Sequence, residues 1–260
     1  MSYDLKMMEK PKTIAYVTDA HIGQRIVLGG KAESGKMHYL REPEEHKDNL
    51  ELILEDIAKR GITEVVFGGD IGTKDANKWL FNLMVKYGFK LRMVLGNHDT
   101  FSEVSKHYSS SDSDDELKYA YEEGDFKYIY LDSSSNSISD HQLRWLQQEM
   151  NTREKVLLFL HHPVLEIDTP LDRAGAALNA RDKIRTALLE AKRETVIFCG
   201  HYHMEDDAID GNIRQLLTPA ASYQIEKLSD EIAIDEQSFG YRLIEIDGSE
   251  LSTEVVMFRK

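Results

Sequence analysis

Short apolar runs alternate with segments of helical periodicity along most of this chain, and this alternation constrains the fold more than any other feature. Strand-like runs occupy residues 13–19, 63–70 and 89–97, and amphipathic segments occupy residues 46–61 and 75–88 between them. A strand–helix–strand alternation favours parallel strands that are joined by right-handed crossovers. We therefore expect an α/β fold.

The rest of the chain continues in the same way and contains no linker or internal repeat that would divide it. Further strand-like runs and helical segments follow in the order 126–134, 140–150, 155–163, 180–193 and 194–203, and a tail over 213–258 alternates strand-like runs with turns. We expect one domain over residues 1–260, with two sheets packed face to face and covered by helices.

Two polar segments interrupt this pattern. Residues 22–45 are rich in glycine and charge, and we expect an insertion loop there on the side of the functional site. Residues 109–116 read SSSDSDDE, which is typical of a solvated acidic loop.

Composition narrows the possible functions. The formal net charge of −14 opposes binding to a nucleic acid duplex, although a small anionic substrate is possible where a local cation reverses the field. Cys199 is the only cysteine, which fits a reducing compartment. No run of about 18 apolar residues and no signal-peptide core occur, so we expect a cytoplasmic protein without membrane association.

Five apolar runs end on polar residues that can bind a metal ion. These residues are Asp19 with His21, Asp70 after Gly69, Asn97-His98-Asp99 after Gly96, His161-His162, and His201 with His203 after Gly200. In open α/β sheets, groups that are distant in sequence meet outside the carboxyl ends of the strands. This mixture of carboxylate, amide and imidazole suits Mn, Fe or Zn, whereas Ca²⁺ would prefer oxygen alone.

Spacing and position suggest how these residues could be arranged around metal ions. In Asp-x-His and His-x-His, residues two apart on an extended or tightly turning segment project to the same side. Asp70 stands alone between the other groups, so it is the natural bridge between two cations. Each motif alone has a simpler explanation, such as a packed histidine, a Gly-Asp turn or a helix cap. Their joint occurrence after five apolar runs favours a single site.

In order, these five blocks resemble the calcineurin-like metallophosphoesterases, and the resemblance covers about residues 13–223. It implies a four-layer α/β/β/α sandwich, with two mixed sheets flanked by helices. The segment LRWLQQEM before LLFLHHP, and LTPAASYQI after the last block, are similar to the class III cyclic-nucleotide phosphodiesterase and glycerophosphodiesterase branch. Thr73 and Lys74 depart from the family, because many relatives carry another acid a few residues after Gly-Asp.

The resemblance also implies a set of metal ligands. One cation would be bound by Asp19, His21, Asp70 and His203, and the other by Asp70, Asn97, His161 and His201. His161 is chosen over His162 because it follows the strand directly, which leaves His162 as a neighbour.

The same resemblance implies a mechanism. Two divalent or mixed-valence metal ions (Mn, Fe or Zn) would activate a bridging hydroxide that attacks phosphorus in line. His98 would face the substrate without binding metal and either stabilise the phosphoryl oxygens or protonate the leaving alkoxide. Asp99 would hydrogen-bond to this imidazole and orient it.

We therefore expect a phosphoesterase acting on small phosphodiesters, with 3′,5′-cyclic nucleotides as the best single substrate class. The alternatives are a phosphomonoesterase or broad organophosphate hydrolase, a nuclease, which the net charge disfavours, and a non-catalytic interaction scaffold, which the complete ligand set disfavours. Related enzymes often dimerise, so a homodimer is possible.

Several polar residues outside the ligand set receive simpler interpretations. His38, Arg41 and His46 could meet a nucleotide or glycerol group, but the solvated surface is the expected position. Tyr202 could stack on a base but is expected to pack, and Tyr223 could border the pocket. Asn179 and Arg181 are possible pocket residues, but nothing in their spacing requires it.

Overall fold

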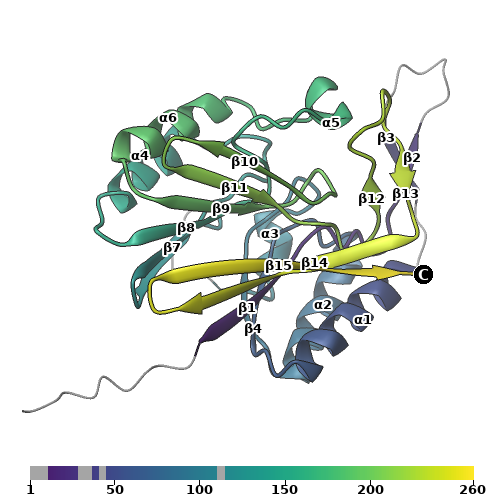
Figure 1. The fold of residues 1–260 in the computed structure, drawn as a ribbon. Coiled ribbons are helices and arrows are strands. Elements are labelled where there is room, and N and C mark those ends of the chain that lie inside the picture. Colours follow the sequence, from purple (N-terminus) through teal and green to yellow (C-terminus); the bar gives the residue numbers. More distant parts are fainter. Residues whose placement is uncertain (1–10, 29–36, 41–44, 110–114) are drawn as a thin grey trace, which may run out of the picture.

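The structure is a computed structural model, and it describes residues 11–28, 37–40, 45–109 and 115–260. Its elements follow one another as drawn in Figure 1: β1 Lys12–Val17, β2 Arg25–Leu28, β3 Met37–Leu40, α1 Glu45–Lys59, β4 Glu64–Phe67, α2 Lys74–Tyr87, β5 Lys90–Met93, α3 Phe101–Val104, β6 Tyr119–Glu123, β7 Phe126–Tyr130, α4 Asp140–Glu149, β8 Lys155–Phe159, α5 Pro170–Arg173, α6 Arg181–Ala191, β9 Thr195–Cys199, β10 Asp206–Asp210, β11 Ile213–Leu217, β12 Gln224–Ile225, β13 Ile234–Asp235, β14 Ser238–Asp247 and β15 Glu250–Arg259.

The first sheet has the strand order β15-β14-β1-β4-β5. Strands β1, β4 and β5 are parallel, whereas β14 and β15 are antiparallel additions beside β1. The last residues of the three parallel strands, Val17, Phe67 and Met93, are partners in the register. The segments that follow these strands therefore leave the sheet at the same level.

The second sheet has the order β10-β11-β9-β8-β7-β6. Its four central strands are parallel, and β10 and β6 are antiparallel edges. Tyr130, Phe159 and Phe198 are partners in neighbouring strands, so β7, β8 and β9 also finish close together. Both sheets are mixed, as expected from the sequence.

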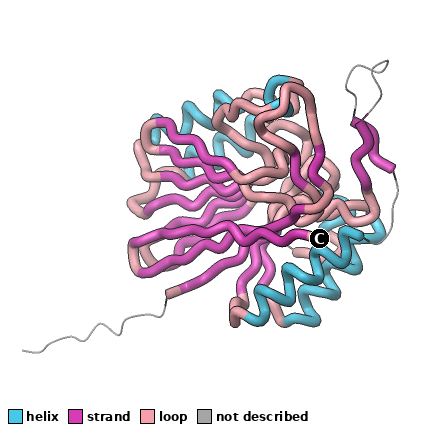
Figure 2. The backbone as a smooth tube through the Cα atoms, turned by 45° about the vertical axis from the view of Figure 1, so that its right-hand side comes forward, coloured by secondary structure: helices cyan, strands magenta, loops and turns pink. Residues whose placement is uncertain are grey.

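The predicted helices cover the outer faces of the two sheets (Figures 1 and 2). On α1, Leu50, Ile53, Leu54 and Ile57 are fully buried and belong to the same apolar cluster as Val65 of β4. On the other side of the molecule, α4 and α6 contribute Leu146, Ile184 and Leu188 to a second cluster. Their 3.6-residue spacing places these residues on one face of each helix.

A third cluster lies between the sheets. It includes Tyr16 and Val66 from the first sheet, and Phe159 and Phe198 from the second. The rings of Phe159 and Phe198 stack with centroids 5.2 Å apart. Helices, sheet, sheet and helices thus form four layers, and the expected α/β/β/α sandwich is confirmed.

The segment 22–45 is only partly a loop. Strands β2 and β3 form an antiparallel pair in which Arg25 is the partner of Leu40, so part of the expected insertion loop is β-structure. Residues 29–36 and 41–44 lie outside the described part of the chain, as does most of the expected acidic loop 109–116. Within the described ranges, no helix has both the length and the apolar character needed to cross a membrane.

Candidate metal centre

The polar strand ends meet at one edge of the sandwich, and several of them have an unusual backbone conformation. Asp19, His21, Asp70, His201 and His203 all have positive φ values, between 42° and 66°. Non-glycine residues rarely occupy this left-handed region, and such strain clusters at functional sites. The predicted same-side projection of Asp-x-His and His-x-His therefore arises from tight turns and not from extended strands.

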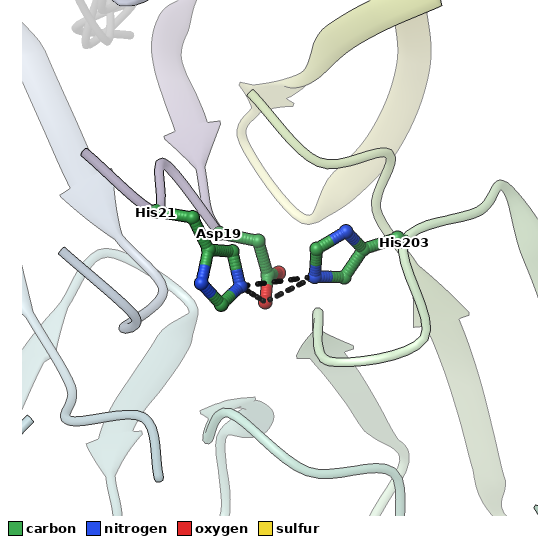
Figure 3. Close-up of side chains that lie close together, drawn as sticks. All are labelled: Asp19, His21 and His203. Atoms are coloured by element: carbon green, nitrogen blue, oxygen red, sulfur yellow. Dashed lines mark hydrogen bonds and ion pairs between the residues drawn. The ribbon is translucent and has the colours of Figure 1, made fainter. Parts of the chain in front are cut away.

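The first group of donors combines residues that follow strands of both sheets. Asp19 and His21 follow β1, and His203 follows β9 (Figure 3). Oδ1 of Asp19 lies 3.2 Å from Nε2 of His203, which in turn lies 3.2 Å from Nε2 of His21. All three side chains are buried, and their potential ligand atoms lie within 4.8 Å of one another. Three donors at this separation can hold a metal ion.

Asp70 belongs to both of the other groups of potential metal ligands. Asp70, His161 and His201 have ligand atoms within 4.8 Å of one another, and so do His21, Asp70 and His98. Oδ2 of Asp70 lies 3.2 Å from Nε2 of His161 and 3.5 Å from Nε2 of His21. Asp70 thus lies between the imidazoles of the two halves, where a bridging carboxylate was expected.

Three buried donor atoms near these groups receive no hydrogen bond from the described residues. They are Oδ1 of Asp19, Oδ1 of Asn97 and Nε2 of His161. Leaving buried polar atoms without a partner costs free energy, and native proteins pair nearly all of them. A cation would satisfy all three, so the residues present fit a metal centre.

In two of the histidines, a hydrogen bond to a backbone carbonyl determines which ring nitrogen carries the proton. Nδ1 of His161 lies 2.8 Å from the carbonyl oxygen of Gly68, and Nδ1 of His203 lies 3.0 Å from that of Tyr223. A carbonyl can only accept, so these nitrogens carry the proton and donate it. Nε2 of each ring is left to face the donor groups, which is how outer hydrogen bonds orient metal-binding histidines.

In His201 the other ring nitrogen, Nε2, is the one that is hydrogen-bonded to a backbone carbonyl. Its Nε2 donates to the carbonyl oxygen of Ala176 at 2.9 Å, which leaves Nδ1 for the centre. Nδ1 of His21 lies 3.2 Å from Oε1 of Gln24, so Nε2 of His21 points toward Asp70. Neither Ala176 nor Gln24 was identified from the sequence, because backbone and amide oxygens have no sequence signature.

Electrostatics keep the two carboxylates ionised. Burial alone would raise the pKa of Asp70, but the nearby imidazoles of His161 and His21 hold that pKa well below its usual range. Burial opposes protonation of His161, yet Asp70 and Asp19 raise its pKa to about 10. Burial lowers the pKa of His201 to about 4, and the nearby His161 adds to this effect. The two ionised carboxylates therefore favour positive charge at the centre.

Glycines leave room for the carboxylates. A Cβ atom on Gly96 would overlap the Asp70 carboxylate, and a Cβ atom on Gly200 would overlap the Asp19 carboxylate. Neither glycine has a positive φ. Close approach, and not turn formation alone, is thus the reason for glycine at these two positions.

The role expected for Asp99 needs correction. Its carboxylate accepts hydrogen bonds from the backbone N–H groups of Asp70 (2.7 Å), Ile71 (3.0 Å) and Gly96 (2.9 Å). Burial and the Asp70 charge raise the pKa of Asp99 to about 7. Asp99 therefore ties two loops together, where the sequence had suggested that it orients the His98 ring.

His98 lies at the edge of the centre. Its backbone N–H donates to Oδ1 of Asp70 at 2.8 Å, and its ring centroid lies 5.1 Å from that of His21. The side chain is half-buried and lines a cavity of about 50 Å³ beside the donor groups. This position allows contact with a molecule bound in the cavity.

The lining of the cavity is partly polar and partly apolar. It includes donor residues and His98, together with Leu171, Ala176, Tyr223 and Ile225. Tyr223 thus borders the cavity as expected. Leu171, Ala176 and Ile225 were missed, because their sequence surroundings resemble any apolar segment.

The cavity is not lined by Tyr202, Arg181 or Asn179, which were also considered from the sequence. Tyr202 is fully buried in the cluster beneath α6, so it packs as expected. Arg181 binds Asp172 at 3.0 Å and does not line the cavity; neither does Asn179, which is exposed. Arg41 lies outside the described residues, and the side chain of His38 is not described.

The expectation that His46 lies on the solvated surface was wrong. It is half-buried on α1, and its Nδ1 lies 2.8 Å from the carbonyl oxygen of His21. Its ring centroid lies 5.9 Å from that of Tyr223, so it supports the turn that carries His21.

A two-sheet sandwich that gathers carboxylates, an amide and imidazoles at its strand ends defines a metal-dependent hydrolase. The family model for calcineurin-like phosphoesterases matches residues 12–205. The chain belongs to this family and is a metal-dependent phosphoesterase.

Individual proteins agree with this assignment. A probable cyclic nucleotide phosphodiesterase of Fibrobacter succinogenes is 25% identical over 255 residues, covering 96% of this chain and 95% of the relative. A probable glycerophosphodiester phosphodiesterase of Arcobacter nitrofigilis is 27% identical over 175 residues, covering 62% and 64%. The crystal structure of a dimetal phosphatase from Danio rerio has the same fold, with a TM-score of 0.63 at 13% identity, covering 95% of this chain and 98% of that one.

Proposed function

We propose that the centre binds two metal ions of the Mn, Fe or Zn type. Asp19, His21, Asp70 and His203 would bind the first. Asp70, Asn97, His161 and His201 would bind the second, so Asp70 would belong to both. The buried atoms of Asp19, Asn97 and His161 that make no hydrogen bond carry this proposal, because a cation is the partner that satisfies all three. The outer hydrogen bonds of the histidine rings support it.

The proposed reaction is hydrolysis of small phosphodiesters, with 3′,5′-cyclic nucleotides as the best single substrate class. The family supports phosphoester chemistry, and the relative from Fibrobacter succinogenes, which matches over nearly the whole chain, is named for cyclic nucleotides. The relative from Arcobacter nitrofigilis is named for glycerophosphodiesters, so this class belongs in any substrate test.

When bound, the metal ions supply Lewis acidity and a nucleophile at neutral pH. The chain supplies the geometry around them. Asp99 fixes the backbone of Asp70 and Gly96, so the shared carboxylate and the Asn97 loop keep a constant separation. His98, next to this loop and on the cavity wall, would hold phosphoryl oxygens or give a proton to the leaving alkoxide.

A substrate panel tests this proposal. The purified protein is reconstituted with Mn²⁺, Fe²⁺ or Zn²⁺ and assayed on cyclic nucleotides, glycerophosphodiesters, bis(p-nitrophenyl) phosphate and p-nitrophenyl phosphate. We expect hydrolysis of diesters to exceed that of the monoester. Higher activity on the monoester would instead favour a phosphomonoesterase or a broad organophosphate hydrolase. A protein that binds no metal after reconstitution would be a non-catalytic scaffold.

A further inference from the structure

His162 is fully buried beside the centre, and both of its ring nitrogens are used elsewhere. Nε2 lies 3.0 Å from Oδ1 of Asn136, and Nδ1 lies 2.8 Å from the hydroxyl oxygen of Ser133. An amide oxygen only accepts, so Nε2 carries the proton and Nδ1 accepts from the hydroxyl. The Ser133 oxygen in turn accepts the backbone N–H of His162 at 3.4 Å. In this arrangement His162 has no nitrogen left for a metal ion.

The ring of His162 lies against His201. Their centroids are 4.2 Å apart with an interplanar angle of 45°, and the ring of His161 lies 5.0 Å from that of His162 at 84°. The His162 ring therefore packs against two of the proposed ligands. Because both of its nitrogens are hydrogen-bonded, the ring cannot rotate without breaking one of these bonds.

Asn136 connects the His162 ring to the segment that contains Ala176, whose carbonyl orients His201. Its backbone carbonyl accepts the N–H of Asn179 at 2.8 Å, and its φ of 57° places it in the left-handed region. Asn179 belongs to the segment 174–180, which also contains Ala176, whose carbonyl oxygen accepts from Nε2 of His201. One residue thus contacts the His162 ring through its side chain and the 174–180 segment through its backbone.

The same segment is anchored at its two ends. The guanidinium group of Arg181 lies 3.0 Å from both carboxylate oxygens of Asp172. The backbone N–H of Asp172 donates to the Thr169 hydroxyl. The position of the Ala176 carbonyl is therefore set by contacts on both sides, together with the hydrogen bonds from Ala176 N–H to the Leu171 carbonyl and from Asn179 N–H to the Asn136 carbonyl.

We propose that His162, Ser133 and Asn136 are positioning residues that hold His201 with Nδ1 toward the second cation site. The inference rests on the proposed function, in which His201 binds that cation. None of the three residues lines the cavity or belongs to the groups of potential metal ligands in the described part of the chain. They act by fixing the ring face and the hydrogen-bond acceptor of His201.

The most selective variant is Asn136→Gly. Glycine accepts a positive φ without strain, so the turn and the carbonyl that binds Asn179 are retained while the Oδ1 acceptor is lost. Asn136→Asp restores an acceptor and also tolerates the left-handed region. Asn179→Ala is the matched control, because the Asn179 side chain is exposed and its role in the network is through the backbone N–H alone.

Calorimetric titration of the metal-free protein with Mn²⁺ gives the first measurement. We expect Asn136→Gly to weaken one of two sites by about 10–100-fold, the range typical for loss of an outer partner of a metal ligand, and to leave the other unchanged. Asn136→Asp and Asn179→Ala should bind like the wild type. Wild-type affinity at both sites in Asn136→Gly would overturn the inference. Ser133→Ala should repeat the site-selective loss if Asn136→Gly does not fold.

Ring nitrogen NMR of histidine-labelled, metal-free protein separates this inference from the proposed function. We expect wild-type His201 to be the Nε2–H tautomer. We expect Asn136→Gly to give a mixture of tautomers, because His162 without its Asn136 acceptor no longer fixes the face of the His201 ring. If the wild type binds no Mn²⁺, the proposed function fails, yet the ring spectra still decide whether the network positions His201. An unchanged His201 tautomer in Asn136→Gly and Ser133→Ala would overturn the positioning role.

Discussion

The guanidinium group of Arg242 on β14 donates a hydrogen bond to the carbonyl oxygen of Leu217 at the end of β11, at 2.8 Å. This bond joins the first sheet to the second. The arginine is only 3% exposed, and burial lowers the pKa of its side chain. Its other hydrogen bonds go to the hydroxyls of Thr218 and Thr253.

Arg242→Met keeps most of the side-chain volume but leaves these acceptors without their donor. We expect the free energy of unfolding to fall by about 2 kcal/mol, because buried acceptors that lose a partner pay their desolvation cost. Urea denaturation monitored by circular dichroism measures the change. Arg214→Met, at an exposed position on β11, is the control. Equal stability of the two variants would show that the bonds across the sheets contribute little.

Asp70→Asn tests the shared carboxylate. The amide keeps the shape but removes the charge that both proposed sites use, so we expect metal affinity to fall on the order of 10²-fold and activity to disappear with it. Elemental analysis after dialysis gives the metal content. Asp75→Asn, on the exposed side of α2, should retain both metal and activity. Full metal content in Asp70→Asn would contradict a bridging role.

His98→Ala separates binding from chemistry. We expect metal content to remain and turnover to fall by roughly 10²–10⁴-fold, as for loss of a general acid. Steady-state kinetics on the best diester of the panel, beside metal analysis, provide the test. His107→Ala, an exposed histidine a few residues downstream, serves as the control. Loss of metal together with activity would instead assign His98 to the ligands, in keeping with its place near His21 and Asp70.

Gly96→Ala tests the close approach of the Asn97 loop to Asp70. A methyl group there would overlap the Asp70 carboxylate, so we expect weakened metal binding as well as a lower melting temperature. Gly124→Ala is a useful comparison. That glycine has a φ of 62°, and a methyl group added to it would meet nothing within 4 Å, so the variant should lose about 1 kcal/mol of stability through backbone strain and keep its metal. Similar metal affinities in the two variants would argue against the overlap.

Much of the architecture was predictable because the relevant information is local. The apolar face of α1 follows from the spacing of Leu50, Ile53, Leu54 and Ile57, and glycine beside polar residues marks the ends of β4 and β5. Parallel strands then bring those ends to one edge. The residues gathered at the centre are accordingly those that the sequence had indicated.

The outer contacts of the centre were not predictable in the same way. Ala176 orients His201 through a backbone carbonyl, a group that every residue carries, so the sequence offers no sign of it. The role of Asp99 was predicted wrongly for a related reason. Because Asp99 is next to His98 in the sequence, a contact between their side chains was expected, but the Asp99 carboxylate accepts hydrogen bonds from the backbone N–H groups of Asp70 and Gly96. Ser133 had a usable signal, because it too follows a strand, β7.

The donors of the centre come from both sheets. Asp19, His21, Asp70 and Asn97 follow strands of the first sheet, and His161, His201 and His203 follow strands of the second. Each proposed cation would therefore act as a cross-link between the halves of the sandwich. Metal loading and the packing of the sheets would then be thermodynamically linked, so that a change at the buried interface would alter metal affinity without touching a ligand.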